Sequence, residues 1–199
     1  MRAPVRVVLA SGSASRAALL AQAGVDCVRD PSDVDEDALK RAMALEPTGR
    51  VALALAIAKA RRVAARQPGA LVIGGDQMLD CEGRRFDKPA DRAAARAQLL
   101  ALRGRAHTLP TAAVVVRDDA VLWQSVETPR MVVRAFSDAF LDDYLDRVGD
   151  AVTRSVGGYQ IEGLGVQLFE RIEGDFFTIL GLPMPQLLGF LRAEGALPT

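Results

Sequence analysis

The first half of the chain alternates short continuous apolar runs with longer stretches in which apolar residues recur at helical spacing. The apolar runs predict strands at Val5–Ala10, Val25–Val28 and Ala70–Gly75. A turn at Glu82-Gly83 separates two short extended pieces. The helical spacing predicts helices at Ala14–Ala23, Asp33–Ala44, Gly49–Ala65 and Ala90–Leu102. This order of elements is typical of an α/β fold.

The second half is richer in predicted strands. Extended segments are expected at Ala106–Val116, Ala120–Glu127 and Arg130–Phe136, with a turn at Asp118-Asp119. A helix over Ser137–Val148 follows, and glycines then separate the expected strands Tyr159–Glu162, Val166–Ile172 and Phe176–Gly181 from a closing helix, Pro183–Ala193. We expect a mixed twisted sheet flanked by helices. The length suits a single domain, residues 1–199, built as two lobes with a central cleft, although the pattern gives no lobe boundary.

Composition narrows the classes of function. Half of the residues are apolar and 25 basic residues balance 25 acidic ones, so the basic excess typical of nucleic-acid binders is missing. Two distant cysteines, Cys27 and Cys81, and a single histidine, His107, offer little to a zinc site or a serine–histidine triad. Any metal is therefore expected on carboxylates, which favour Mg²⁺ or Mn²⁺. With no leader and no membrane-spanning apolar run in the sequence, we expect a cytoplasmic protein.

The turn after the first strand has the residues of an anion site. Ser11-Gly12-Ser13 lies between a strand and a helix start, where backbone N–H groups and hydroxyls converge and the helix dipole adds positive potential. Arg16, in the first helical turn, can fork onto phosphate oxygens. An isolated turn of this kind is more often a serine cap beside a solvated arginine. The turn alone leaves both interpretations open.

Asp76 is the sharpest single candidate. It follows Gly74-Gly75 at the carboxyl end of an apolar strand, where open α/β sheets bind ligands. The glycines allow another group to approach closely, so Asp76 is a candidate metal ligand or general base. Lys88 precedes a proline, which favours an extended backbone from which the lysine can enter a cleft, although loop lysines are usually solvated.

Several other features have ordinary structural explanations when taken singly. The Asp35-Glu36 pair ahead of a helix complements the helix dipole, and Lys59 at the end of an apolar helix face is expected to reach solvent. The glycine-spaced segment Gly157–Gly165 is expected to be a bulged strand, or a strand whose backbone lines a flat ligand. His107 is expected to be a packed or hydrogen-bonding sheet residue.

Taken together and in this order, these segments resemble the Maf family of nucleoside triphosphate pyrophosphatases. The family turn Leu-Ala-Ser-x-Ser-Pro-x-Arg-x-x-Leu-Leu is matched from Leu9 to Leu20, except that Ala14 replaces the proline. The similarity spans nearly the whole chain. The other matching motifs are Asp35-Glu36, Lys59-Ala60, Gly74-Gly75-Asp76, Lys88-Pro89, Leu102-x-Gly104-x-x-His107-x-x-x-Thr111, Gly157-x-Tyr159-x-x-x-Gly163 and Leu180-Gly181-Leu182-Pro183.

The resemblance implies hydrolysis of a nucleoside triphosphate to the monophosphate and pyrophosphate with a divalent cation, Mg²⁺ or Mn²⁺. It also implies a fold similar to inosine triphosphate pyrophosphatases and a homodimer. Asp76 is implied as the catalytic residue that orients or deprotonates the attacking water, and Asp76 and Glu36 as metal ligands. The residues implied in binding the triphosphate are Ser11, Ser13, Arg16, Lys59 and Lys88.

The resemblance also bears on base specificity. Family members similar to dTTP/UTP pyrophosphatases tend to carry Thr and Gln at the positions of Gln77 and Glu162, whereas members similar to 7-methyl-GTP pyrophosphatases carry Gln and Glu. A carboxylate can accept hydrogen bonds from guanine's edge and offset the charge of a methylated ring. Ser15 departs from the pattern, because relatives commonly have arginine or an aromatic residue there.

Three alternatives stay open at this point. The first is the same reaction with dTTP or UTP as substrate. The second is a nucleotide-binding regulator of cell division with little turnover, which the family's association with septum formation suggests. The third is a nucleic-acid binder using Arg61, Arg62 and Arg66, although these arginines are more typical of a solvated helix face.

Overall fold

The computed structural model describes residues 5–198, which form two compact units. Unit 1 comprises residues 5–77, 111–127 and 175–198, and unit 2 comprises residues 78–110 and 128–174. Within the described residues each unit has one five-stranded sheet with helices, which confirms the expected mixed α/β class. The chain leaves unit 1 and returns to it twice. No single change of composition therefore marks a boundary in the sequence.

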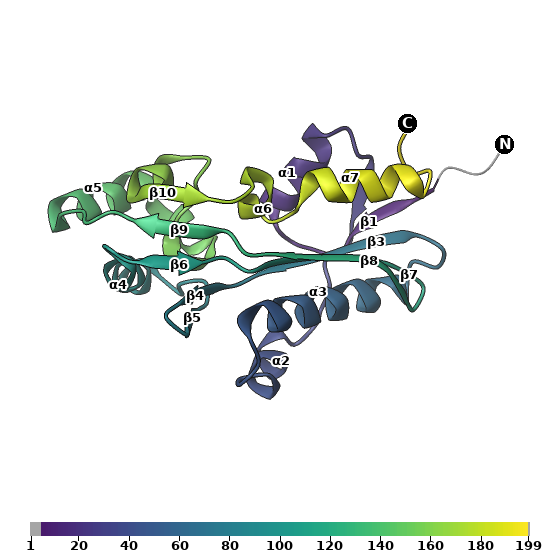
Figure 1. Ribbon diagram of the computed structural model, residues 1–199, viewed down its shortest axis with the longest axis horizontal. Helices are drawn as coiled ribbons and strands as arrows, with labels where there is room; N and C mark the ends of the chain where they lie inside the picture. The colour runs from purple at the N-terminus through teal and green to yellow at the C-terminus, as the bar shows by residue number, and fades with distance from the viewer. Residues whose placement is uncertain (1–4, 199) are drawn as a thin grey trace. The chain divides into compact units, whose positions relative to one another are not determined.

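The sheet of unit 1 has the order β2-β1-β3-β7-β8 (Figure 1). β1 pairs in parallel with β2 and β3, whereas β7 pairs antiparallel with β3 and β8. The carboxyl ends of β1 and β3 therefore meet at one edge of the sheet. The bounds of these strands are Val7–Leu9 for β1, Cys27–Arg29 for β2, Leu71–Gln77 for β3, Thr111–Arg117 for β7 and Ala120–Glu127 for β8.

Helices cover both faces of this sheet. α3 lies on one face, while α1 and α7 lie on the other (Figure 1). α3 approaches closely because of Gly74: a Cβ atom there would lie 2.3 Å from the backbone oxygen of Ala56. The opposite face buries Leu9, Ile73 and Leu187 in one apolar core. The helices of unit 1 are α1 (Ala14–Gln22), α2 (Glu36–Ala42), α3 (Thr48–Ala64), α6 (Phe176–Leu180) and α7 (Met184–Ala193).

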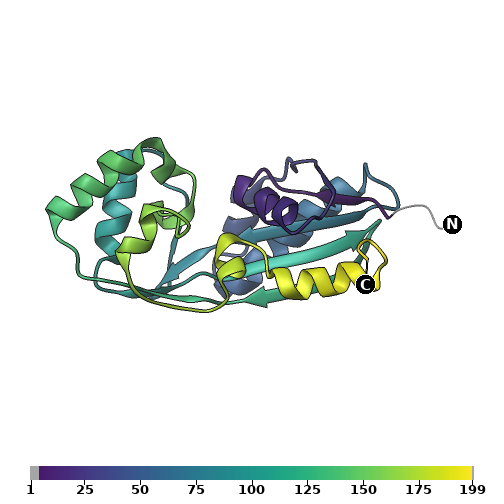
Figure 2. The same cartoon turned by 90° about the horizontal axis from the view of Figure 1, so that it is seen from above.

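Unit 2 has an antiparallel sheet of order β10-β9-β6-β4-β5. Its helices α4 (Arg92–Leu102) and α5 (Asp138–Val148) lie side by side (Figure 2), and Arg92 donates to the backbone oxygen of Leu145 at 3.0 Å. The strands are β4 (Leu79–Cys81), β5 (Arg84–Phe86), β6 (Ala106–Thr108), β9 (Arg130–Val133) and β10 (Phe169–Glu173). The short 3₁₀ turns are η1 (Gly149–Thr153), η2 (Val156–Gly158) and η3 (Leu164–Leu168).

Two of the expected strands were wrong. Tyr159–Glu162, in the glycine-spaced segment Gly157–Gly165, connects η2 and η3 and forms no strand. Gly157 and Gly158, just before it, adopt the left-handed φ values of +78° and +72°, which interrupt extended backbone there. Phe176–Gly181 is the helix α6 with its end at Gly181. The carboxylate of Asp175 caps it by accepting from the Thr178 N–H at 2.7 Å, so the cap outweighs the strand propensity of the aromatic and β-branched residues.

Two other predictions needed adjustment. The expected strand Ala106–Val116 is divided at Leu109-Pro110 into β6 and β7, which belong to different sheets. The helix expected from Asp33 begins at Glu36, because Asp35 is its N-cap and accepts from the Ala38 N–H at 2.9 Å. Among the helices between residues 5 and 198, none combines the length and the apolar composition needed to span a membrane.

Candidate active site

Three charged side chains meet at the carboxyl end of β3. The Lys59 ammonium nitrogen lies 2.7 Å from Asp76 Oδ1 and 2.8 Å from Glu36 Oε1. Lys59 and Asp76 are only 7% and 6% exposed, whereas Glu36 is half-buried. Lys59 was expected to reach solvent when judged alone, and it instead bridges two carboxylates in the protein interior. The structure therefore brings together three of the residues that the family resemblance implied.

The alternation of β3 explains this arrangement. Successive strand residues point to opposite faces, so Gly74 and Asp76 face α3 while Gly75 and Gln77 face the other side. Asp76 therefore meets Lys59, which lies near the end of α3. Glu36 reaches the same ammonium from the first turn of α2. Three segments that are distant in the sequence contribute one charge each.

Burial raises the pKa of Asp76 above its ordinary value, and the positive charge of Lys59 opposes that shift. Glu36, a second nearby negative charge, acts in the same direction as burial. A carboxylate whose pKa is moved toward neutrality is a stronger proton acceptor than an ordinary aspartate. Perturbed carboxylates of this kind are concentrated at catalytic sites, although buried ion pairs in a purely structural role also occur.

The expected anion turn lies beside this cluster, because β1 and β3 are parallel and Ala10 donates to the backbone oxygen of Ile73 at 2.8 Å. The Ser13 hydroxyl caps α1 by accepting from the Arg16 N–H at 3.3 Å. The Ser11 hydroxyl, which is buried, accepts from Arg16 Nη1 at 3.2 Å. Hydroxyls, backbone N–H groups and a guanidinium thus converge at one helix N-terminus, the arrangement suited to phosphate.

Arg16 is held between two glycines. A Cβ atom at Gly75 or at Gly181 would lie 3.0 Å from Arg16 Nε, and the backbone oxygen of Gly181 accepts from that nitrogen at 3.0 Å. Burial lowers the pKa of Arg16, while the charges of Asp76 and Glu36 oppose the shift. The guanidinium nevertheless stays protonated, because an arginine side chain does not lose its proton in proteins. Arg16 is therefore a fixed positive charge next to the carboxylates.

The Gly181 contact was missed by sequence reasoning. Gly181 belongs to the family motif Leu180-Gly181-Leu182-Pro183, for which the sequence alone predicted no contact. Gly181 ends α6 with φ +119°, a value that an L side chain rarely adopts. The motif thus supplies both the end of a helix and a carbonyl for Arg16.

The predicted specificity residues differ in their surroundings. The Gln77 side-chain amide donates to Thr111 Oγ1 at 2.8 Å and to the backbone oxygen of Ile179 at 3.0 Å. These bonds fix Gln77 against α6. Ser15 lies half-buried in the first turn of α1. Lys88 and Glu162 are exposed residues of unit 2, and their roles stay predictions of the resemblance.

The site contains two carboxylates that could bind the divalent cation implied by the family resemblance. Within residues 5–198, no group of three or more His, Cys, Asp or Glu side chains is arranged to hold a metal ion. The Lys59 ammonium nitrogen nevertheless lies within hydrogen-bond distance of both Asp76 and Glu36. A metal ion at the position of that nitrogen can therefore contact both carboxylates. Mg²⁺ commonly uses one or two carboxylates and completes its shell with water and substrate phosphates. The donor set fits that mode of binding.

His107 has the structural role that its sequence context suggested. It is 2% exposed, and its Nε2 lies 2.7 Å from the Tyr159 hydroxyl in unit 2. Burial lowers the pKa of His107 to about 4, so the imidazole is neutral near pH 7. Burial also raises the pKa of Tyr159. This pair holds a β6 residue against the turn after η2 and brings no nucleophile beside the histidine.

Comparisons with known proteins agree with this geometry. Residues 6–194 match the family model Maf, described as Maf-like protein. The chain is 57% identical to the "Nucleoside triphosphate pyrophosphatase" of Paramagnetospirillum magneticum, with 96% of this chain and 99% of the relative covered. The protein of the same description from Granulibacter bethesdensis is 49% identical, with 97% and 99% covered. That from Rhodospirillum rubrum is 51% identical, with 96% of each chain covered.

Among solved structures, the chain resembles a crystal structure described as "Nucleoside-triphosphatase / dITP/XTP pyrophosphatase" from Mycobacterium abscessus. The sequence identity is 17% and the TM-score is 0.45, with 96% of this chain and 98% of that chain covered. This similarity is too low to carry an argument, and the likeness to inosine triphosphate pyrophosphatases stays a prediction. The family match over residues 6–194 is decisive by itself. The chain belongs to the Maf-like protein family.

Proposed function

We propose that the chain is a nucleoside triphosphate pyrophosphatase that releases a nucleoside monophosphate and pyrophosphate. The observation that carries the proposal is the buried cluster of Asp76, Lys59 and Glu36 beside the Arg16 turn. A proton acceptor and an anion site at one sheet edge are what hydrolysis of a phosphoanhydride requires. Relatives described as nucleoside triphosphate pyrophosphatases at up to 57% identity support the same reaction.

In this reaction water attacks the α-phosphorus, and the bond from that phosphorus to the bridging oxygen breaks. Asp76 accepts the proton of the attacking water, a role favoured by its raised pKa. The electron pair of the broken bond goes to the bridging oxygen, so pyrophosphate leaves with added negative charge. Arg16 and the hydroxyls of Ser11 and Ser13 bind that charge through N–H and O–H donors.

We also propose a divalent cation, Mg²⁺ or Mn²⁺, held by Asp76 and Glu36. When bound, such an ion supplies charge neutralisation to the phosphate oxygens. Lys59 lies between the same two carboxylates. When the divalent cation replaces this ammonium between the two carboxylates, Lys59 can turn to a phosphate oxygen of the substrate.

Among triphosphates, 7-methyl-GTP or a related modified nucleotide is the proposed substrate. The support is the pair Gln77 and Glu162, since a carboxylate offsets the positive charge of a 7-methylated ring. Lys88 is proposed as a further phosphate-binding residue by the same resemblance. The homodimer and the cytoplasmic location stay predictions.

A substrate panel with product identification tests the proposal. Purified protein with Mg²⁺ or Mn²⁺ is given 7-methyl-GTP, GTP, dTTP and UTP, and the products are separated by ion-exchange chromatography. Pyrophosphate with the monophosphate is the expected product, and 7-methyl-GTP is expected to give the highest kcat/KM. Orthophosphate with the diphosphate would overturn the proposed bond cleavage.

The same panel separates the alternatives. Preference for dTTP and UTP would overturn the methylated-base proposal and leave the reaction intact. Tight binding of triphosphates without hydrolysis under either metal would favour a nucleotide-binding regulator. Substitution Glu162→Gln is the matched test of base recognition, because it removes the negative charge and keeps the size of the side chain. We expect it to lower kcat/KM for 7-methyl-GTP more than for GTP.

A further inference from the structure

The Lys59–Glu36 pair is the inner end of a longer arrangement, here called the charge ladder. Three cations of α3 and its C-terminal extension recur at spacings of three and four residues, which places them on one helix face. Three acidic residues meet them in reverse order: two lie in the segment between β2 and α2, and the third is the first residue of α2. The pairs are Lys59–Glu36, Arg62–Asp33 and Arg66–Asp30.

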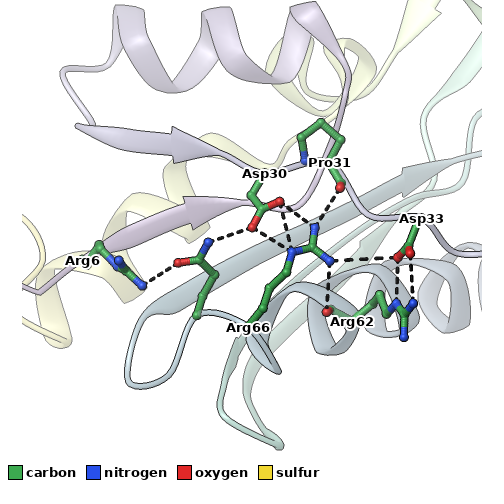
Figure 3. Close-up of polar contacts among 7 residues, drawn as sticks. Arg6, Asp30, Pro31, Asp33, Arg62 and Arg66 are labelled. Carbon is green, nitrogen blue, oxygen red and sulfur yellow. Dashed lines mark hydrogen bonds and ion pairs between the residues drawn. The ribbon is translucent and has the colours of Figure 1, made fainter.

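The outer two pairs have bidentate geometry (Figure 3). Arg62 Nε and Nη2 donate to the two carboxylate oxygens of Asp33 at 2.7 and 2.9 Å. Arg66 Nη2 donates to Asp30 Oδ1 at 2.6 Å and to the backbone oxygen of Pro31 at 3.0 Å. Forked contacts of this kind fix direction as well as distance. They define the path of the segment along the helix.

The far end of the ladder is tied to the sheet. The Asp30 N–H donates to the backbone oxygen of Leu9, the last residue of β1, at 3.0 Å. Gln67 Nε2 donates to Asp30 Oδ2 at 2.7 Å, and Arg6 Nη2 donates to Gln67 Oε1 at 2.5 Å (Figure 3). The segment that ends at Glu36 is therefore anchored where it leaves the sheet and again at Asp33.

Stability alone does not account for these pairs. The side chains of Arg62 and Asp33 are 60% and 62% exposed, and exposed ion pairs contribute little to folding because water and salt screen them. Their geometric effect is larger, since only two residues separate Asp33 from Glu36. A shift of Asp33 along α3 moves the carboxylate of Glu36 relative to Asp76. The fixed pairs beside a cation-binding carboxylate thus resemble the supporting contacts of metal ligands.

We propose that Arg62 and Arg66 are positioning residues, which hold Glu36 in place for the divalent cation through Asp33 and Asp30. The inference deepens the proposed function and rests on it. Arg62 contacts Asp33, and Arg66 contacts Asp30, so both are argued to act through Glu36 rather than on the reacting atoms. Their effect is on the distance between two carboxylates, and it is measured on the protein without any nucleotide.

The test measures Mn²⁺ binding to the free protein by titration calorimetry and by electron paramagnetic resonance. The double variant Arg62→Gln with Arg66→Gln is expected to bind Mn²⁺ about tenfold more weakly than the wild type, as loss of contacts that support a metal ligand does. Hydrolysis by this variant should fall at low Mn²⁺ and recover at saturating Mn²⁺. The matched control is Arg96→Gln, which breaks an exposed pair with Asp142 in unit 2 and should change neither quantity.

Rescue distinguishes positioning from general damage. Arg62→Lys keeps the charge and loses the fork, so it should weaken Mn²⁺ binding less than Arg62→Gln. If the double variant fails to fold, judged by its thermal transition, these two single variants carry the comparison. Mn²⁺ affinity equal to that of the wild type in every folded variant would overturn the inference while leaving the proposed function intact. Absence of hydrolysis by wild type overturns the proposed function, and absence of Mn²⁺ binding overturns the inference.

Discussion

Both units bury polar side chains, but they do so in opposite ways. In unit 1 the buried polar groups include a charged pair: Lys59 and Asp76 form an ion pair at 2.7 Å. In unit 2 the buried groups are neutral: His107 and Tyr159 share one hydrogen bond at 2.7 Å. Burial of a charge costs far more than burial of a hydrogen-bonded neutral group. The charged pair of unit 1 therefore costs more to bury than the neutral pair of unit 2, and the proposed function gives that cost a use.

Burial also shifts the pKa values of Asp76 in unit 1 and His107 in unit 2 in opposite directions. Burial raises the pKa of Asp76, which makes that carboxylate a stronger proton acceptor than an ordinary aspartate. Burial lowers the pKa of His107 to about 4, which removes the histidine from proton transfer at pH 7. The residue type most often associated with acid–base catalysis is therefore the inert one here. Position in the fold decides the role.

The largest effect is expected from Asp76→Asn. This change keeps the shape of the side chain and removes the proton acceptor, so kcat should fall by about 10³-fold. Steady-state release of pyrophosphate measures the change, and circular dichroism confirms the fold. Activity within a few-fold of the wild type would remove Asp76 from catalysis and end the contrast between the two units.

Lys59→Met is expected to lower kcat/KM by about 100-fold, because a cation is lost from the phosphate site.

The pH dependence of kcat/KM in the wild type and in Lys59→Met tests the same ion pair. Asp76 acts as a carboxylate, so kcat/KM of the wild type should fall as pH drops through its pKa, at a pH above the ordinary aspartate value of about 3.9. Without Lys59 the opposing positive charge is gone, and the acid limb should move to higher pH. An unmoved limb would show that another group titrates.

Gly75→Ala tests the packing around Arg16. The added Cβ atom would lie 3.0 Å from Arg16 Nε and 3.3 Å from its Cδ, so the guanidinium must shift. We expect about a tenfold loss in kcat/KM, because small misplacements of a positioning group are costly. Gly83→Ala is unsuitable as the control, since its φ is +83°, whereas Gly189→Ala meets no atom within 4 Å and should leave activity unchanged.

The smallest effect on turnover is expected from His107→Gln, which should change hydrolysis at pH 7.5 less than about twofold because no proton transfer depends on it. Its effect is on stability. The unfolded histidine has the higher pKa, so the wild type should lose about 3 kcal/mol as pH falls from about 6.5 to about 4. Urea unfolding at several pH values should show that this loss is absent from the variant. Identical pH dependence in both proteins would contradict a neutral buried imidazole.

Sequence patterns predicted most of the regular elements, and the family resemblance named the members of the charged cluster. β8 was predicted with its observed bounds, and the helix expected over Ser137–Val148 is α5, with Ser137 as its N-cap. An apolar run that closes with two glycines predicted that Asp76 lies at the carboxyl end of a strand. These features depend on local periodicity and turn chemistry, which one sequence contains.

What the sequence did not reveal depends on contacts between distant segments. Lys59 alone predicted a solvated side chain, since nothing nearby in the chain shows that Asp76 and Glu36 would meet it. Arg62 and Arg66 are exposed, as the expected solvated helix face requires, but their acidic partners Asp33 and Asp30 were not predicted. The segment Phe176–Gly181 was mistaken for a strand because aromatic and β-branched residues outnumber its cap signals.

The twofold return of the chain to unit 1 has a consequence for biosynthesis. Residues 175–198, which supply α6 and α7, leave the ribosome after the whole of unit 2, yet Leu187 and Leu191 belong to the apolar core of the first sheet. Unit 2 has all its residues by position 174. The nascent polypeptide must therefore carry its first sheet without α7 while unit 2 is completed, and the carbonyl of Gly181 that restrains Arg16 emerges only after unit 2.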